Sequence, residues 1–427
     1  MSKNGIFDAL YGRITFDSEI MSLMAAPLVQ RLRHVRLSNI DSVALPGLAN
    51  ISRFEHALGV ATLAGKLQFF STLSKYDRLL LQSSALLHDW AITAFGHLVE
   101  EAYAYAGAKF EHEGKLNELV MGDNYAEVGG VDRQILGGRE TGLRKWASSC
   151  VGARKADDLI LDITRTIMGE GRFGQLIAGT MDIDNIDNVY RVAYHIGLRF
   201  DTSIPDQLAR SVNGMESQTG APIFDKSSEE YITAWLQMRE QVYDCLMLAE
   251  PDFTAKLMLI CAVVAAFREG ELSSIEWNLT DHELITRLRN SKNRECKESV
   301  ERWLVGEYWD ASSLVWMEGV RPTFLQLNEF NEVLSENLGR PIFSYCIKDK
   351  RKRKLSISYS DGSSVDYGAS STQWVLGVAS PIRKNFTISE NEIFVKSAED
   401  FFNTRCISKA NFNNVSDDDA GDQICLI

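Results

Sequence analysis

Histidines gather in the N-terminal part of this chain, close to carboxylates. Five of the seven lie at or before position 112, namely His34, His56, His88, His97 and His112. His88 is followed directly by Asp89, and the later segment MDIDNIDNVYR carries Asp184 in a helix start. Two imidazoles and two carboxylates form a mixed nitrogen and oxygen ligand set, which suits Mn, Fe, Ni, Co or Zn and leaves positions open for water and substrate. The residue types therefore predict a catalytic metal centre.

Helices must position these residues, because helical periodicity dominates from Ile20 to about Arg289 with few prolines to interrupt it. The segment SKYDRLLLQSSALLHDW starts with a capping-box-like pair, Ser74 and Asp77, and delivers His88 and Asp89 at its C-terminal end. A second helix is predicted for SSEEYITAWLQMREQVYDCLMLAE, which is acidic in its first turn and carries regularly spaced apolar residues.

The sequence pattern changes after about Pro341 from helical periodicity to alternating β-forming residues. An Asp-Gly turn in SYSDGSSV separates two candidate strands there. We predict a mainly α domain over residues 1–330, a small α+β domain over 331–415 and a disordered acidic tail over 416–427. The glycine-rich and charged segment from Met121 to Glu140 is predicted to be a loop or a short insertion.

Composition narrows the class of ligand. The chain has 427 residues, 45% of them hydrophobic, enough for one large core and a smaller one. A net charge of -13 makes nucleic acid an unlikely partner and favours a small ligand chelated through a cation. The seven cysteines form no C-x-x-C pair, the N-terminus shows no secretory signal, and the longest apolar run, Leu257 to Phe267, is too short to span a membrane. A cytoplasmic protein without a membrane anchor is expected.

The motifs together resemble the HD-domain superfamily of metal phosphohydrolases, and within it the deoxynucleoside triphosphate triphosphohydrolases of the dGTPase and sterile-alpha-motif HD-domain type. The resemblance covers roughly the first 270 residues, in order and spacing, through PLVQRLRHVRLS, PGLANISRFEHALGVATLAG, LLHDWAITAFGHLVEEA, KFEHEGKL, MDIDNIDNVYR and MREQVYDCLMLAE. Such an ordered series is far more specific than a lone His-Asp pair. It implies a helical HD-domain core.

The resemblance also implies a role for each matching residue. By their positions in RFEH, LLHD and MDID, the implied ligands of a divalent metal (Mn, Fe, Mg, Co, Ni or Zn) are His56, His88, Asp89 and Asp184. In AFGHLVEE, His97 would give a proton to the leaving oxygen and Glu100 would orient it. His112 in FEHE would contact the phosphate chain, and Arg53 would clamp a phosphate.

Elementary chemistry agrees with those roles. Water on such a metal loses its proton near neutral pH, which yields a hydroxide able to attack phosphorus. An imidazole with a pKa of about 6.5 can protonate the departing alkoxide. His97 and Glu100 are three residues apart, so on a helix the carboxylate can orient the ring. The implied reaction is attack on the α-phosphorus of a deoxynucleoside triphosphate, which releases a deoxynucleoside and tripolyphosphate.

The chain departs from the family pattern at positions that face the substrate. The family reads H-D-x-G-H where this chain reads HDWAI, so Ile92 replaces a phosphate-facing histidine. Relatives carry a glutamine near Leu37 and Ser38, and a tyrosine and an aspartate where this chain has Asn188 and Val192. These changes concern recognition of the deoxyribose 3′-hydroxyl. Ile92 predicts slower catalysis, an altered substrate or a site that binds with little turnover.

Other polar residues favour structural roles. His195 is interpreted as a histidine that packs or that supports a ligand from behind, and His34 and His282 as structural. Helix capping and solvation are favoured for Asp182 and Asp187, which flank the metal aspartate. For Arg53 an ion pair with Glu55 or with a helix carboxylate competes with the phosphate role. The basic run from Lys348 to Lys354 is interpreted as a solvated strand end in preference to a nucleotide site.

The leading hypothesis is thus a metal-dependent (deoxy)nucleoside triphosphate phosphohydrolase with a nucleotide substrate, which by resemblance assembles as a homo-oligomer. One alternative is a phosphodiesterase of signalling nucleotides, or a nuclease acting on single-stranded nucleic acid. A second alternative, motivated by Ile92, is a catalytically weak nucleotide-sensing protein that regulates a partner through its C-terminal domain.

Overall fold

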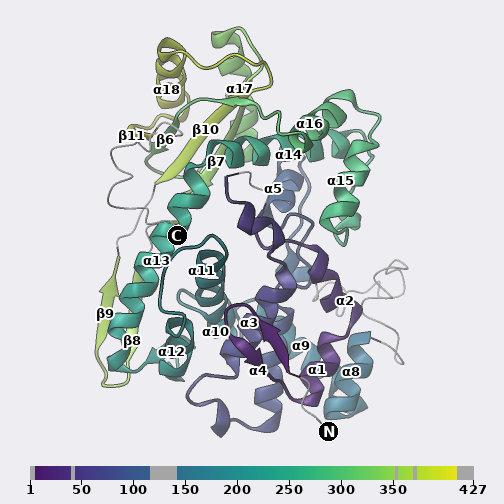
Figure 1. The fold of residues 1–427 in the computed structure, drawn as a ribbon, viewed down its shortest axis with the longest axis vertical. Coiled ribbons are helices and arrows are strands. Elements are labelled where there is room, and N and C mark those ends of the chain that lie inside the picture. The colour runs from purple at the N-terminus through teal and green to yellow at the C-terminus, as the bar shows by residue number, and fades with distance from the viewer. Residues whose placement is uncertain (1–4, 40–43, 116–141, 352–353, 369–372, 411–427) are drawn as a thin grey trace.

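The chain folds into a mainly helical body with small sheets, as predicted (Figure 1). The computed structural model describes residues 5–39, 44–115, 142–351, 354–368 and 373–410. The predicted loop from Met121 to Glu140 and the predicted tail 416–427 lie outside the described residues.

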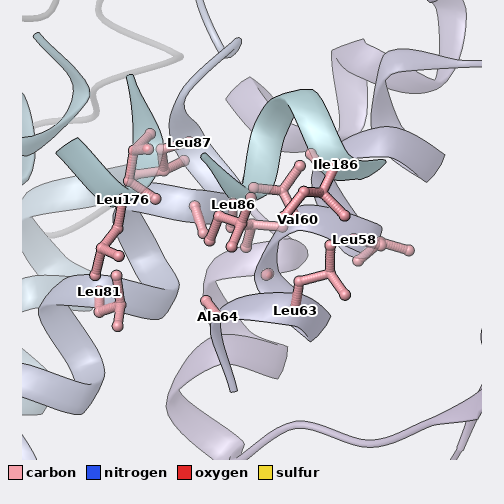
Figure 2. Close-up of a cluster of buried hydrophobic side chains, with 14 of the residues drawn as sticks. Leu58, Val60, Leu63, Ala64, Leu81, Leu86, Leu87, Leu176 and Ile186 are labelled. Carbon is pink, nitrogen blue, oxygen red and sulfur yellow. The ribbon is translucent and has the colours of Figure 1, made fainter. Parts of the chain in front are cut away.

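Three helices form the centre of the first hydrophobic core: α3 (Arg53–Ala64), α4 (Lys75–Leu87) and α11 (Ile183–His195). Helix α3 starts where the Ser52 hydroxyl accepts the Glu55 backbone N–H at 3.2 Å, and α4 starts where Ser74 accepts the Asp77 N–H at 3.1 Å, so the predicted cap is confirmed. Their apolar faces meet in a buried hydrophobic cluster that includes Val60, Leu86 and Ile186 (Figure 2). This packing fixes where the polar ends of the three helices lie.

The remaining helices surround these three or lead to the C-terminal sheet. Their bounds are α1 (Ser18–Met24), α2 (Pro27–Gln30), α5 (His97–Tyr105), α8 (Gly142–Val151), α9 (Ala156–Ile167), α10 (Gly174–Ile177), α12 (Ile204–Ser211), α13 (Glu229–Leu248), α14 (Glu250–Arg268), α15 (Asp281–Arg289), α16 (Arg294–Leu304), α17 (Phe324–Leu338) and α18 (Ile388–Phe402). Helix α14 contains the apolar run from Leu257 to Phe267 and is largely buried. Within the described ranges, no helix is long and apolar enough to cross a membrane.

A five-stranded antiparallel sheet forms the centre of the second core. Its strands are β5 (Asp310–Ala311), β6 (Leu314–Met317), β7 (Phe343–Lys348), β10 (Trp374–Ser380) and β11 (Cys406–Ala410). Strand β10 pairs with β5, β6 and β7, and all seven of its residues are buried. Helix α17 packs against β7 and α18. The same hydrophobic cluster takes in α5 and α14, so the C-terminal sheet is continuous with helices of the first 330 residues.

A hairpin connects the two cores. Strands β8 (Leu355–Tyr359) and β9 (Ser364–Tyr367) flank the predicted Asp-Gly turn, where Gly362 has a φ of +84°. The hairpin leaves the C-terminal sheet between β7 and β10 and lies beside α13 (Figure 1). There β8 pairs in parallel with β4 (Pro222–Phe224), itself antiparallel to β3 (Val212–Met215). The domain boundary at residue 330 stays a prediction. Strands β5 and β6 of the C-terminal sheet precede this residue, and β8, which follows it, packs into the first core.

Replacing the buried Ile357 on β8 with alanine should lower the free energy of unfolding by about 2–4 kcal/mol, because the cavity lies in the first core. Urea denaturation followed by circular dichroism measures the change. Ser364→Ala on the exposed face of β9 is the control and should change stability by less than about 0.5 kcal/mol. Equal, small effects of both variants would show that the hairpin does not stabilise the first core.

Candidate metal centre

Three of the four predicted metal ligands converge at the ends of the central helices. His56 lies in the first turn of α3, His88 caps the end of α4 and Asp184 lies in the first turn of α11. The His56 Nε2 atom is 2.9 Å from Asp184 Oδ1 and 3.2 Å from His88 Nε2. One ligand atom from each of the three residues lies within 4.8 Å of the other two. Side chains distant in sequence thus face one centre.

The orientation of the two imidazoles fits a cation. His56 Nδ1 lies 2.7 Å from Asp187 Oδ2, and His88 Nδ1 lies 2.8 Å from the Ala85 carbonyl oxygen. Both partners can only accept, so each Nδ1 donates, and each Nε2 that carries no proton can present its lone pair to a cation. The two Nε2 atoms and the carboxylate oxygen of Asp184 lie so close that positive charge is needed among them, from a proton or from a cation. This donor set therefore suits a divalent metal ion.

Asp89, the fourth predicted ligand, lies at the edge of the cluster. Its Oδ2 atom is 3.5 Å from His88 Nε2 and accepts a hydrogen bond of 2.5 Å from Arg53 Nη1. Burial raises the pKa of Asp89, but the charges of Arg53 and of His88 hold it well below its usual range. Arg53 is itself buried, and its ion-pair partner among the described residues is Asp89 and not Glu55; its phosphate role stays a prediction.

Asp187 was expected to cap or solvate the helix start, and this expectation is wrong. The side chain is fully buried and holds His56 Nδ1 on one side and the Arg191 guanidinium on the other, with Arg191 Nε 2.9 Å from Oδ2. The capping role of Asp182 is confirmed, because its Oδ1 accepts the Asn185 N–H at 2.7 Å. Asp187 follows Asp184 by three residues and precedes Arg191 by four. These two spacings were the signals that the side chains share a buried face of α11.

Arg191 extends this support to other parts of the chain. Its side chain is fully buried and donates to Asp8 at 3.0 Å and to Glu55 at 2.8 Å. Asp8 ends strand β1 (Ile6–Asp8), which pairs with β2 (Gly12–Ile14). Glu55 in turn lies 3.2 Å from His195 Nε2, so His195 sits behind the cluster. A Cβ atom on Gly59 would lie 1.9 Å from Asp187 Oδ1, which explains the glycine at this point of α3.

Burial alone lowers the pKa of His56, but hydrogen bonds to Asp184 and Asp187 outweigh it and raise the pKa to about 9. Burial raises the pKa of Asp187, whereas the charge of Arg191 and the bond to His56 lower it to about 2. Asp187 is therefore an ionised acceptor behind His56, as carboxylates behind metal-bound histidines commonly are.

The three residues predicted to act on the substrate form a second group. Glu100 lies between two imidazoles: its Oε2 is 2.9 Å from His97 Nδ1 and its Oε1 is 2.8 Å from His112 Nδ1. Burial raises the pKa of Glu100, but hydrogen bonds to His112 and His97 lower it to about 2. His112 Nε2 lies 3.7 Å from Asp89 Oδ1, so this group adjoins the first. His97 is half-exposed, whereas His112 is buried.

A strained turn places His97 at the start of α5. Phe95 and Gly96 have φ values of +54° and +60°. A Cβ atom on Gly96 would lie 2.5 Å from Arg53 Nη2, so only a glycine allows the backbone to pass this close to the arginine. Asp281 holds the turn, because its Oδ1 accepts the Phe95 N–H at 2.8 Å while its Oδ2 accepts from Arg36.

Comparisons with known proteins give distant matches. An uncharacterised protein of Methanocaldococcus jannaschii is 24% identical over 290 residues, which are 67% of this chain and 55% of that protein. The deoxynucleoside triphosphate triphosphohydrolase SAMHD1 of Danio rerio is 30% identical over 139 residues, and SAMHD1 of Bos taurus is 33% identical over 118 residues. These matches cover 30% and 25% of this chain.

The similarity supports an HD-domain relationship. No protein-family model matches the chain. The chain spans 55% of the archaeal relative and 22% and 20% of the two SAMHD1 proteins. The name of the SAMHD1 proteins gives them a deoxynucleoside triphosphate triphosphohydrolase activity.

Ile92 marks the departure from the HD-domain pattern. Its side chain is fully buried in the first hydrophobic core, and its carbonyl oxygen accepts a 2.7 Å hydrogen bond from Arg31 Nη2. The position is thus held by apolar packing.

Substituting Asp187 with asparagine should weaken metal binding by about 10- to 100-fold, because His56 loses the ionised acceptor that fixes its ring. Competition titration with a coloured chelator measures the affinity. Asp182→Ser, which keeps a helix cap beside the site, is the matched control and should leave the affinity within about twofold. Unchanged affinity in Asp187→Asn would show that His56 is held by other contacts.

Proposed function

We propose that this protein is a metal-dependent phosphohydrolase of nucleoside triphosphates, which converts a deoxynucleoside triphosphate into a deoxynucleoside and tripolyphosphate. The observation that carries the proposal is the meeting of His56 Nε2, His88 Nε2 and Asp184 Oδ1 within 4.8 Å. The distant similarity to triphosphohydrolases supports the nucleotide as substrate. Assembly as a homo-oligomer remains a prediction from the resemblance, and a cytoplasmic location remains a prediction from the cysteine pattern.

The proposed metal ligands are His56, His88, Asp184 and, from the edge of the cluster, Asp89. When bound, a divalent cation lowers the pKa of water and offsets the charge of phosphoryl oxygens. Asp187 orients His56, and the Ala85 carbonyl orients His88. Arg53, next to Asp89, is proposed to bind phosphate oxygens once substrate competes for its second amino group, which now lies 3.3 Å from the Leu37 carbonyl.

The proposed acid is His97. Glu100 is ionised and accepts the Nδ1–H of His97, which orients the ring so that a proton on Nε2 can pass to the leaving oxygen. The partial exposure of His97 gives this proton access to a ligand. His112, buried and held by the same carboxylate, directs Nε2 toward Asp89 and is proposed to contact the phosphate chain.

Removal of the metal with EDTA should reduce hydrolysis of nucleoside triphosphates to background, and adding Mn should restore it, because the ligands alone cannot activate water. Anion-exchange chromatography of the products, together with elemental analysis of the protein, tests this. Tripolyphosphate is the expected product. Mononucleotides released from single-stranded nucleic acid would instead establish the phosphodiesterase or nuclease alternative. A metal-free protein that binds no metal on titration would contradict the triphosphohydrolase and this alternative alike.

Replacing His97 with glutamine should lower kcat by about 100- to 10,000-fold while leaving metal content unchanged, since the ring donates a proton but is not one of the proposed ligands. His282→Gln, on the exposed start of α15, is the control with the same change of chemistry. If the two variants have the same kcat, His97 is not the acid.

Ile92 favours a second candidate function, a nucleotide-sensing protein with weak catalysis. Ile92 stands where the HD-domain pattern has a phosphate-facing histidine, so the site has one imidazole fewer to contact phosphate. Saturable nucleotide binding without product, in every metal tried, would establish this function. Measurable tripolyphosphate release would favour the hydrolase.

A further inference from the structure

A cavity of about 550 Å³ lies beside the C-terminal sheet and is lined by residues other than the proposed metal ligands. Its lining comes from α14, α16, α17 and β7, and from Tyr105 at the end of α5. Helix α14 packs against α16 and β7, and α17 packs against β7 and α5, so the cavity belongs to the second core. Small-molecule sites have volumes of about 300–1,000 Å³. The size of this cavity therefore fits a small organic ligand.

Apolar side chains form much of the cavity wall. Leu257, Ile260 and Val264 line it from α14, at the three- and four-residue spacing that places side chains on one face of a helix. Trp309 and Phe343 line it as well, and their ring centroids lie 5.0 Å apart. An apolar group that leaves water for this wall is stabilised by the hydrophobic effect. The ligand is therefore expected to carry an apolar portion.

Arg302 of α16 also lines the cavity, and part of its guanidinium is not used by the protein. Its Nη1 donates to the Pro381 carbonyl oxygen at 2.8 Å, whereas Nη2 is buried without a hydrogen-bond partner among the described residues. A buried donor without an acceptor is costly, and more so when it carries charge. Arg302 therefore favours a ligand that brings an acceptor with negative charge.

The acids near Arg302 do not neutralise it. Three of them, on α16 and just after it, pair with other cations: Glu298 with Arg294 at 2.6 Å, Glu301 with Lys297 at 3.9 Å and Glu307 with Arg383 at 3.3 Å. Glu269 and Glu295 line the cavity too, but both are exposed, and the charge of Arg268 in the same lining offsets one of them. Among the acids that the structure describes, none forms an ion pair with Arg302.

The hydroxyl of Tyr105 is a second unused donor in the lining. Tyr105 is 8% exposed, and its Oη atom is buried without a hydrogen-bond partner in the described part of the chain. Burial raises the pKa of Tyr105 well above its usual range, so the hydroxyl keeps its proton and can donate. The lining thus combines an apolar wall with two donors that lack an acceptor.

We propose that this cavity binds a small amphipathic carboxylate, with its anionic group at Arg302 and its apolar chain against α14 and Phe343. An arginine matches a carboxylate in charge and in geometry, and the apolar wall receives the chain. A nucleoside triphosphate is disfavoured here, because its several negative charges would face Glu269, Glu295 and Glu298. The inference goes beyond the proposed function and does not rest on it, since no proposed metal ligand takes part.

The test is calorimetric titration of the full chain with octanoate and with octanol, in EDTA so that a metal does not contribute. The two probes share an apolar chain and differ in charge. We expect saturable binding of octanoate that is tighter than the binding of octanol by about tenfold or more, because only octanoate compensates Arg302. The affinity for octanoate should fall as the salt concentration increases.

Three variants locate the site. Arg302→Gln should weaken octanoate binding by about tenfold or more and change the affinity for octanol by less than about twofold, because only the charge partner is lost. Arg289→Gln, at an exposed position of α15, is the matched control and should leave both affinities within about twofold. Val264→Trp should abolish the binding of both probes, because the larger side chain fills the cavity.

Absence of saturable octanoate binding would overturn the proposal. Equal weakening of the two probes in Arg302→Gln would do the same, and this comparison holds even if the variant is less stable, since both probes meet the same fold. Octanoate binding that Val264→Trp leaves intact would place the site elsewhere. A protein that binds neither metal nor nucleotide would contradict the proposed function and leave this titration unaffected.

Discussion

The hydrogen bond between His56 and Asp187 is the contact on which the candidate site depends. It fixes the ring of the imidazole that lies nearest to both His88 and Asp184. Asp187 is itself held by Arg191, and the close passage of α3 over this pair is allowed only by Gly59. The apolar packing of α3, α4 and α11 brings the helix ends together, and this buried ion network then orients the polar atoms that face one another.

Helix α5 lies between the candidate site and the C-terminal sheet. Glu100 faces the two imidazoles, whereas the adjacent Glu101 accepts from Tyr345 of β7 and from Arg321. One helix therefore shares contacts with both cores. The hairpin β8–β9 provides a second connection between the cores.

Ile92 shows how one position can serve the core or the site. The residue follows the His-Asp pair closely, where an imidazole could reach a phosphate, yet it packs among apolar side chains. The neighbouring imidazoles, His97 and His112, are both retained and share one carboxylate. The residues proposed to hold a metal and to move a proton are therefore all present, with one imidazole fewer to contact phosphate.

The sequence by itself determined the helical class, the caps at Ser74 and Asp182, the hairpin turn and the residues that meet at the candidate centre. These follow from local rules, such as periodicity and turn chemistry, and from motifs with fixed spacing. Only the tertiary structure decided that Asp187 lies behind His56 and that Asp89 bonds Arg53. Partners of buried charges are chosen by the packing of helices far apart in the chain, and no local pattern encodes that choice.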